Sequence, residues 1–188
     1  NLEFSKYEGM HYGALLNDPS LRWKGAGELK QLNQQLQSFE GIEAAELPQG
    51  LQADLREYQQ TGYNWLQFMQ KYQFNGILAD DMGLGKTIQA LAMLLAEKES
   101  GRVTLPSLVI APTSLMSNWR REVEKFAPQL SVLTLQGQHR KNKFDQLADH
   151  DIILTTYPLI IRDKAVYEKQ DFHYLILDEA QAIKNAKA

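Results

Sequence analysis

The stretch Asp80-Asp81-Met82-Gly83-Leu84-Gly85-Lys86-Thr87 separates a short apolar run at residues 76–79 from a helical pattern at residues 86–99. A short apolar run beside turn residues predicts a buried strand, and apolar residues spaced by three and four predict a helix. The two glycines between them predict a tight turn. The sequence therefore predicts a strand, a glycine-rich loop and a helix in direct succession.

The loop carries the residue types that hold phosphate groups in a Walker A loop. Gly83 and Gly85 let the backbone turn its N–H groups toward phosphate oxygens, and the helix that follows adds its positive dipole end. Lys86 would reach the β- and γ-phosphates, and the Thr87 hydroxyl would bind Mg²⁺. Asp80 stands where the strict pattern has its first glycine. The alternative is a turn that only caps a core helix, and the flanking strand and helix favour nucleotide binding over it.

Short apolar runs alternate with helical patterns from residue 51 onward. The expected strands are 76–79, 108–111, 132–135, 152–155 and 174–177. The expected helices are 54–71, 86–99, 115–126, 143–149 and about 158–167. This alternation predicts an α/β fold in which helices cover both faces of a parallel sheet. Such sheets bind ligands at the carboxyl ends of their strands, so the residues after each strand are the candidate site residues.

Composition excludes several classes of protein. The 188 residues are 44% hydrophobic and 23% charged, as in globular domains. No apolar run approaches the roughly 20 residues of a membrane span. The lack of cysteine excludes disulfides and thiolate metal sites, and the four histidines lack metal-ligand spacing. The net charge of −3 gives no general signal for nucleic acid. A basic cluster at residues 139–143 is a candidate phosphate contact, although a solvated loop is the preferred interpretation.

Residues 1–47 differ from the rest of the chain. They hold four Lys or Arg and seven Asp or Glu, whereas residues 48–188 hold sixteen of each. Apolar residues recur at helical spacing from about residue 28, at Leu29, Leu32, Leu36 and Phe39. Pro48-Gln49-Gly50 then predicts a boundary. We expect residues 1–47 to be a helical N-terminal extension, the end of a preceding region, and residues 48–188 to form a separate lobe.

The second part of the candidate site is Asp178-Glu179-Ala180-Gln181, which follows the expected strand 174–177. Its two carboxylates would lie beside the phosphate loop if both strands share one sheet. Asp178 would hold Mg²⁺, and Glu179 would orient and deprotonate the attacking water. The alternative is an ordinary acidic helix start, where the helix dipole favours carboxylates.

With these motifs in order, residues 51–185 resemble the first RecA-like lobe of the Swi/Snf-related DNA translocases, a branch of the helicase-like ATPases. The segments that carry the resemblance are Leu55-Arg56-Glu57-Tyr58-Gln59 with Gly62 and Trp65, residues 80–87, Pro112-Thr113-Ser114-Leu115 with Asn118-Trp119, Ile153-Leu154-Thr155-Thr156-Tyr157, and residues 178–181 with Ile183-Lys184-Asn185. The family's phosphate loop also lacks the first glycine.

The resemblance implies ATP-driven movement along double-stranded DNA, usually without strand separation. It implies that ATP and Mg²⁺ are the cofactors and that Lys86, Asp178 and Glu179 are catalytic. The metal ligands would be Thr87 and Asp178. The implied nucleotide contacts are Arg56, Gln59, Asp81, Met82, Gly83, Leu84, Gly85, Lys86, Thr87 and Ile88. The implied DNA contacts are Pro112, Thr113, Ser114, Thr155 and Thr156.

The family's lobe continues with a further strand beside the phosphate-loop strand, and a second RecA-like lobe supplies arginine fingers. The resemblance therefore implies an incomplete sheet with altered pairing near residues 77–79, and a fragment that alone hydrolyses almost no ATP. The second lobe and a DNA-bound protein complex are the expected partners, with no membrane. Gln181 resembles the bacterial members, which implies a cytoplasmic, nucleoid-associated protein; a eukaryotic member would be nuclear.

Three other functions remain open from the residues. Another helicase-like ATPase, acting on RNA or unwinding duplexes, shares the phosphate loop and the acidic box. A small-molecule kinase shares the loop, but the pair Asp178-Glu179 disfavours it. A scaffold that binds nucleotide without hydrolysing it is the third alternative, and the intact Lys86, Thr87, Asp178 and Glu179 argue against it.

Overall fold

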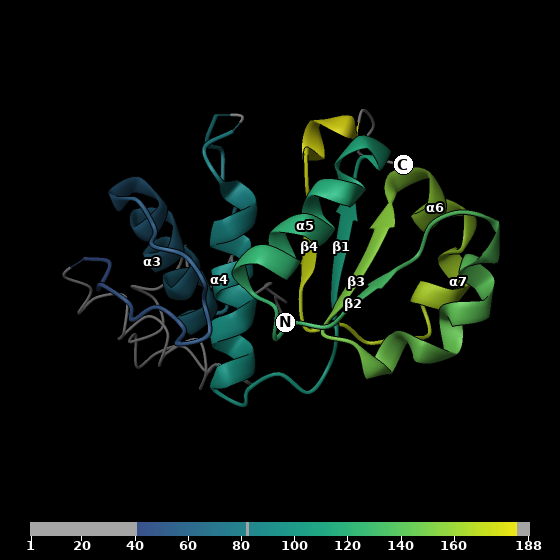
Figure 1. Cartoon of the computed structure of the whole chain (residues 1–188), viewed down its shortest axis with the longest axis horizontal. Coiled ribbons are helices and arrows are strands. Elements are labelled where there is room, and N and C mark those ends of the chain that lie inside the picture. Colours follow the sequence, from purple (N-terminus) through teal and green to yellow (C-terminus); the bar gives the residue numbers. More distant parts are fainter. Residues whose placement is uncertain (1–40, 82, 184–188) are drawn as a thin grey trace, which may run out of the picture.

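The computed structural model describes residues 41–81 and 83–183 (Figure 1). Met82, the predicted helix near residues 28–39 and the end of the last motif, Lys184-Asn185, lie outside the described residues. The described strands form one parallel sheet in the order β2-β3-β1-β4. The strands are β1 (Ser107–Ala111), β2 (Val132–Thr134), β3 (Ile152–Thr156) and β4 (Leu175–Leu177).

Helices cover both faces of this sheet, as predicted. Figure 1 shows α5 in front of the strands, with α3 and α4 to one side and α6 and α7 to the other. The helical elements are α3 (Glu57–Lys71), α4 (Lys86–Glu99), η2 (Thr113–Leu115), α5 (Met116–Phe126), η3 (Gln138–Asp149), α6 (Tyr157–Arg162), α7 (Lys164–Tyr167) and η4 (Ala180–Ala182). The predicted helix 115–126 thus begins as a 3₁₀ turn, and the predicted helix 158–167 is two short helices.

Alternating strand residues build two cores, because successive side chains of a strand point to opposite faces. On one face, Val109 and Ala111 of β1 belong to a buried cluster with Leu91 and Leu95 of α4. On the other face, Leu108 and Ile110 pack in a second cluster that includes Leu147 of η3 and Tyr167 of α7. Both faces of β1 are buried along its whole length, which is typical of a central parallel strand.

The strand predicted at residues 76–79 is wrong: these residues lie outside the sheet. A strand forms only where a neighbour pairs with its backbone N–H and C=O groups, and the described sheet has no strand beside this segment. Ile77 is 86% exposed, and the edge-strand residues Leu175 and Leu177 are 60% and 39% exposed. The expectation of altered pairing near residues 77–79 is therefore confirmed.

Residues 41–47 contain no helix and run along α3. The backbone N–H of Ala45 donates to Oδ1 of Asn64 at 3.0 Å, and the Tyr63 hydroxyl donates to the carbonyl of Glu46 at 2.9 Å. The predicted boundary at Pro48-Gln49-Gly50 is tied to the end of α4, because Glu99 accepts the N–H groups of Gln49 and Gly50, each at 2.8 Å. No helix among the described residues is long and apolar enough to cross a membrane.

The basic cluster at residues 139–143 is only partly solvated, which corrects the preferred interpretation for one residue. Arg140 is buried and donates to both oxygens of Asp163, with Nε–Oδ2 and Nη2–Oδ1 distances of 2.6 and 3.0 Å. This hydrogen bond with Asp163 outweighs desolvation and raises the pKa of the Arg140 guanidinium. The ion pair joins η3 to the start of α7.

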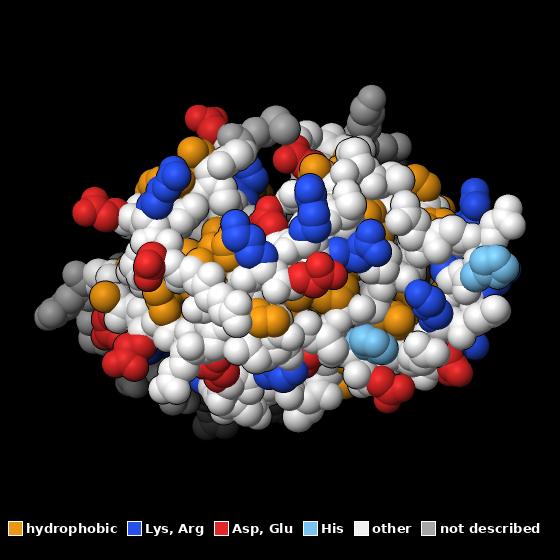
Figure 2. Space-filling model, in the orientation of Figure 1, with side chains coloured by type: hydrophobic (Ala, Val, Ile, Leu, Met, Phe, Trp, Pro, Cys, Tyr) orange, Lys and Arg blue, Asp and Glu red, His pale blue; other side chains and the backbone are white. Residues whose placement is uncertain are grey.

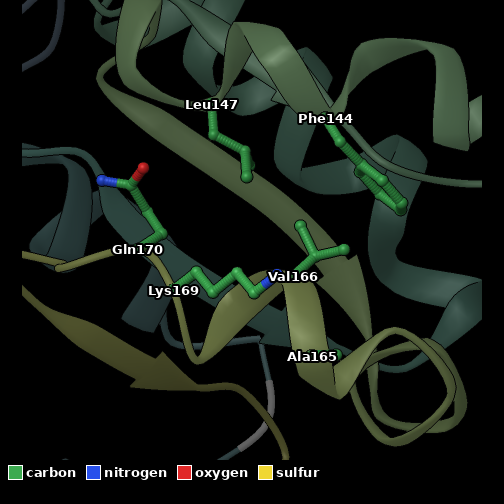
Figure 3. Close-up of a pocket in the computed structure, with 6 residues that line it drawn as sticks. All are labelled: Phe144, Leu147, Ala165, Val166, Lys169 and Gln170. Atoms are coloured by element: carbon green, nitrogen blue, oxygen red, sulfur yellow. The ribbon is translucent and has the colours of Figure 1, made fainter.

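A shallow hollow lies between η3 and the end of α7 (Figure 3). Its lining residues are Phe144, Leu147, Ala165, Val166, Lys169 and Gln170. None of the predicted nucleotide or DNA residues lines it, so the hollow is separate from the candidate site.

Candidate nucleotide and DNA site

The phosphate loop and the acidic box lie at the same end of the molecule, the end toward which the strands point (Figure 1). This is the carboxyl edge of the sheet, where α/β proteins bind ligands. The two motifs were expected to meet here through strands of one sheet, but residues 76–79 reach this end of the molecule without joining the sheet.

Two glycines allow the backbone of the phosphate loop to turn. Gly83 and Gly85 have φ values of +82° and +81°, in the left-handed region that glycine adopts without strain. Gly85 is also the N-cap of α4, so the loop ends where the free N–H groups of that helix begin. A 14-residue helix that starts at Lys86 directs its positive dipole end at the loop. The backbone here fits a phosphate group.

The side chain of Lys86 turns into the loop. Its Nζ donates to the carbonyl oxygens of Asp80 and Asp81, at 2.7 and 3.1 Å. The ammonium group of this half-buried residue is therefore held against the turn by two carbonyl oxygens. A phosphate bound by the loop would meet this cation together with the helix N-terminus, as the sequence predicted for Lys86.

The departure of Asp80 from the strict loop pattern has a structural reason. Its Oδ2 accepts a hydrogen bond at 3.1 Å from Nε2 of Gln89. Gln89 lies one turn into α4 and is fully buried, so the carboxylate fixes the loop to the helix that follows it. Sequence reasoning did not predict this contact, because nothing in the spacing marks Gln89 as a partner.

Gln59 joins α3 to the phosphate loop. Its Nε2 donates to the carbonyl of Leu84 at 3.1 Å, and its Oε1 accepts the backbone N–H of Arg56 at 3.0 Å. The second bond caps the start of α3. The Arg56 side chain is exposed and reaches the hydroxyl of Tyr58 at 3.4 Å. Of the two predicted nucleotide contacts in this segment, Gln59 thus reaches the loop and Arg56 lies at the N-cap of the same helix.

The acidic box is held by three hydrogen bonds to Asp178. Its backbone N–H donates to the carbonyl of Ile110 at 2.9 Å, which continues the pairing of β4 with β1. Its Oδ2 accepts the indole N–H of Trp119 at 2.8 Å. Its backbone carbonyl accepts the hydroxyl of Tyr157 at 2.7 Å. Burial first, and then the charges of Asp178 and Glu179, raise the pKa of Tyr157, so its hydroxyl keeps its proton at neutral pH.

Glu179 adopts a backbone conformation that is rare for its residue type. Its φ and ψ are +50° and +51°, in the left-handed region, and Gln181 donates a side-chain hydrogen bond to its Oε2. Strained backbone of this kind is concentrated at functional sites. The strain therefore supports a role for the predicted catalytic carboxylate.

The five predicted DNA contacts differ in exposure. Thr113 and Ser114 are exposed in η2, directly after β1 and Pro112. Thr155 and Thr156 are 0% and 2% exposed, and the Thr155 hydroxyl donates to the carbonyl of Leu135 at 3.5 Å. The structure thus leaves Thr113 and Ser114 able to contact DNA through their side chains, while the two β3 threonines belong to the core.

A buried polar cluster fixes the far end of α4 to the segment before β4. Glu97 is fully buried; its Oε1 pairs with Nη2 of Arg102 at 2.6 Å and its Oε2 with Nε2 of His173 at 3.1 Å. Burial, followed by the charge of Glu97, raises the pKa of Tyr174 to about 12. The helix of the phosphate loop and the strand of the acidic box are therefore held together at the end opposite the site.

The residue types fit Mg²⁺ bound with a nucleotide. Thr87 and Asp178 offer hard oxygen ligands, and Mg²⁺ usually takes one or two protein ligands together with phosphates and water. Trp119 engages only Oδ2 of Asp178, and a carboxylate has further lone pairs. The described residues contain no group of three or more His, Cys, Asp or Glu that would form a site made of protein ligands alone.

Comparison with known proteins identifies the family. The model of the SNF2-related domain matches residues 58–188. The chain belongs to the SNF2-related domain family. The expected RecA-like lobe and the resemblance to the Swi/Snf-related ATPases are thereby confirmed, since the matched region contains the phosphate loop, the acidic box and the segments between them.

Individual relatives of this SNF2-related domain are much longer. YwqA of Bacillus subtilis is 44% identical over 163 residues, which cover 85% of this chain and 18% of that protein. The chromatin-remodeling ATPase INO80 of Lodderomyces elongisporus is 37% identical over 171 residues, 85% of this chain and 11% of its own. The chain thus spans less than a fifth of these relatives.

A solved structure has the same fold. The SWI2/SNF2 ATPase core of Sulfolobus solfataricus, in complex with double-stranded DNA, is 43% identical, with a TM-score of 0.70. The match covers 78% of this chain and 30% of the other. It supports assignment of the sheet β2-β3-β1-β4 to one lobe of such a core.

Proposed function

We propose that this SNF2-related domain is the first ATPase lobe of a motor that moves along double-stranded DNA at the expense of ATP. The observation that carries the proposal is that two motifs face the same end of the molecule (Figure 1). One is a phosphate loop whose carbonyl oxygens hold the Lys86 ammonium. The other is an acidic box whose Asp178 is bonded to Trp119, in the helix that follows β1. The relation to a DNA-bound SWI2/SNF2 core supports duplex DNA as the partner. The bacterial nucleoid, or a eukaryotic nucleus, is the proposed location.

The residues of the proposed site divide the chemistry between them. The α4 N-terminus and Lys86 bind the β- and γ-phosphates, while Gln59 would read adenine with the help of Arg56. Thr87 and Asp178 would hold Mg²⁺, which neutralises phosphate charge when bound. The Glu179 carboxylate orients the attacking water and accepts its proton. A second lobe would stabilise the charge that develops on the transferred phosphoryl group.

The proposed DNA contact is local. Figure 2 shows Lys and Arg side chains over α5 interspersed with Asp and Glu, and α5 itself carries Arg120, Arg121 and Lys125 beside two glutamates. Exposed Thr113 and Ser114 lie just before this helix. Hydroxyls and backbone N–H groups position phosphates without reading sequence, which suits a motor that must pass over any DNA. A DNA-bound protein complex is the proposed object of the movement.

The experiment that tests this function compares the ATPase rate of the full-length protein with duplex DNA, single-stranded DNA and RNA. We expect duplex DNA to stimulate hydrolysis most. Stronger stimulation by RNA would indicate an RNA-acting helicase-like ATPase. Transfer of the γ-phosphate to a small acceptor would indicate a kinase, and nucleotide binding without hydrolysis would indicate a scaffold.

The geometry of the phosphate loop predicts that Gly85→Ala weakens ATP binding more than Gly83→Ala does. Both positions have positive φ, which costs an alanine about 1–2 kcal/mol. A methyl group on Gly85 would also collide with the side-chain amide of Gln59, whereas Gly83 has open space around it. Anisotropy of a fluorescent ATP analogue with the full-length protein measures both affinities, and equal losses would contradict the placement of Gln59 against the loop.

A further inference from the structure

Trp119 connects α5 to the acidic box. The residue is 3% exposed and belongs to the core between α5 and the sheet, so packing alone would account for its burial. Packing does not account for the direction of its indole, whose N–H donates to Oδ2 of Asp178 at 2.8 Å across 59 positions of sequence. A hydrogen bond to a charged group contributes more than one between neutral groups.

Tyr157 makes a second connection to the same residue. Its hydroxyl donates to the backbone carbonyl of Asp178 at 2.7 Å. Trp119 therefore restrains the carboxylate of Asp178, and Tyr157 restrains its main chain. The two donors follow different strands: Tyr157 comes directly after β3, and Trp119 lies in the helix that follows β1.

Both donors directly follow segments that the sequence predicted to contact DNA, of which η2 is exposed and the end of β3 is buried. The exposed residues Thr113 and Ser114 of η2 lead without a break into α5, and Trp119 lies one turn into that helix. Tyr157 is the first residue of α6, next to Thr156. A shift of η2 or of the β3 end on DNA binding would therefore move a donor to Asp178.

We propose that Trp119 and Tyr157 are positioning residues that couple DNA contact to the orientation of the Asp178 carboxylate. The proposal rests on the proposed function, because it assumes that DNA contacts these segments and that Asp178 serves ATP hydrolysis. Both residues act through Asp178 and not on the reacting atoms. Their effect is on the carboxylate, as with the outer hydrogen bonds that orient metal ligands in other proteins.

The test uses three variants of the full-length protein, each of which keeps an aromatic ring. Trp119→Phe removes the indole N–H, and Tyr157→Phe removes the hydroxyl. Tyr63→Phe is the matched control, because the hydroxyl of this buried tyrosine also donates to a backbone carbonyl, that of Glu46 at 2.9 Å, but in α3. ATPase rates are measured over a range of duplex DNA concentrations and without DNA.

We expect Trp119→Phe to lower the maximal DNA-stimulated rate about tenfold, the lower end of the effect of losing an orienting hydrogen bond to a metal ligand. The basal rate and the DNA concentration at half-maximal stimulation change much less, because DNA binding itself is retained. Tyr157→Phe has the same effect to a smaller degree, and Tyr63→Phe leaves the stimulation unchanged. Basal and stimulated rates that fall in equal proportion would overturn the proposal, since that is the result of a purely structural role.

A second readout needs neither nucleotide nor turnover. In protein labelled with 5-fluorotryptophan, the ¹⁹F resonance that disappears in Trp119→Phe belongs to Trp119. We expect duplex DNA alone to shift this resonance, and Asp178→Asn to shift it without DNA. A resonance that stays unchanged on DNA binding would overturn the coupling. If Trp119→Phe fails to fold, the DNA-stimulated ATPase rate of Tyr157→Phe is compared with that of Tyr63→Phe. Equal stimulation of these two variants would then overturn the proposal.

Failure of this inference is distinct from failure of the proposed function. If DNA does not stimulate the unmodified protein, the proposed function is wrong. If DNA stimulates the unmodified protein and both Trp119→Phe and Tyr157→Phe retain that stimulation, the function stands and the coupling is wrong.

Discussion

Replacing Lys86 by alanine is expected to lower the DNA-stimulated ATPase rate of the full-length protein by roughly 100- to 1,000-fold, the effect of removing one preorganised group that stabilises transition-state charge. The physical reason is the position of the ammonium, held by the carbonyl oxygens of Asp80 and Asp81 inside the phosphate loop. Alanine leaves the helix N-terminus to face the phosphates without the ammonium group. Steady-state ATP hydrolysis with saturating duplex DNA measures the loss.

Lys98→Ala is the matched control for Lys86→Ala. Lys98 lies at the other end of the same helix, is 41% exposed and pairs with Asp151 at 2.7 Å. Exposed ion pairs contribute little to stability, about 1 kcal/mol or less, so this variant should hydrolyse ATP like the unmodified protein. Substantial hydrolysis by Lys86→Ala, with binding of ATP retained, would contradict the assignment of the phosphate site.

The second large effect is expected on stability, from Arg140→Met. Arg140 and Asp163 are 7% and 4% exposed, and their side chains form two hydrogen bonds. Removing one partner of a buried pair leaves the other charge without compensation in the interior. We expect the urea midpoint of the 188-residue chain to fall by about 2 M, from the cost of an unpaired buried charge and the usual urea dependence of unfolding.

Two further variants separate the ion pair from other effects. Lys141→Met, at the exposed neighbouring position in η3, should leave the urea midpoint nearly unchanged. The double variant Arg140→Met/Asp163→Leu should recover most of the loss, because an apolar pair often replaces a buried ion pair without cost. A small effect of Arg140→Met on the urea midpoint, together with weaker DNA binding, would contradict the structural role of Arg140. It would indicate that Arg140 contacts DNA phosphates instead.

Elements with local signals could be predicted from the sequence. The helix after the phosphate loop begins and ends where its pattern places it, at Lys86 and Glu99, because a glycine precedes it and its apolar residues repeat at helical spacing. The central strands were found within one residue at each end, since short apolar runs with both faces buried are typical of parallel sheets.

The strand predicted at residues 76–79 shows where local signals fail. Its apolar run resembles those of β1 and β3, but a strand also requires a neighbour that pairs with it. Nothing within the run reveals whether that neighbour is present. The family resemblance did predict altered pairing here, because it describes the sheet as a whole and not one segment.

The contacts around Asp178 show the same limit for the site. Sequence reasoning placed Asp178 after a strand, but it assigned no separate role to Trp119 or to Tyr157. Their hydrogen bonds join residues 59 and 21 positions apart, and no spacing rule links them. Burial of Thr155 and Thr156 was likewise invisible, since a strand-end threonine has the same sequence signal whether it faces solvent or core.

Displacement of a third strand from a DNA triplex tests the proposed motor most directly. The full-length protein is loaded on the duplex beside the triplex, and release of the third strand is followed with ATP, without ATP and with Lys86→Ala. We predict release that requires both ATP and Lys86, while the two strands of the duplex remain paired. ATP hydrolysis without release of the third strand, or separation of the duplex strands, would contradict movement along intact double-stranded DNA.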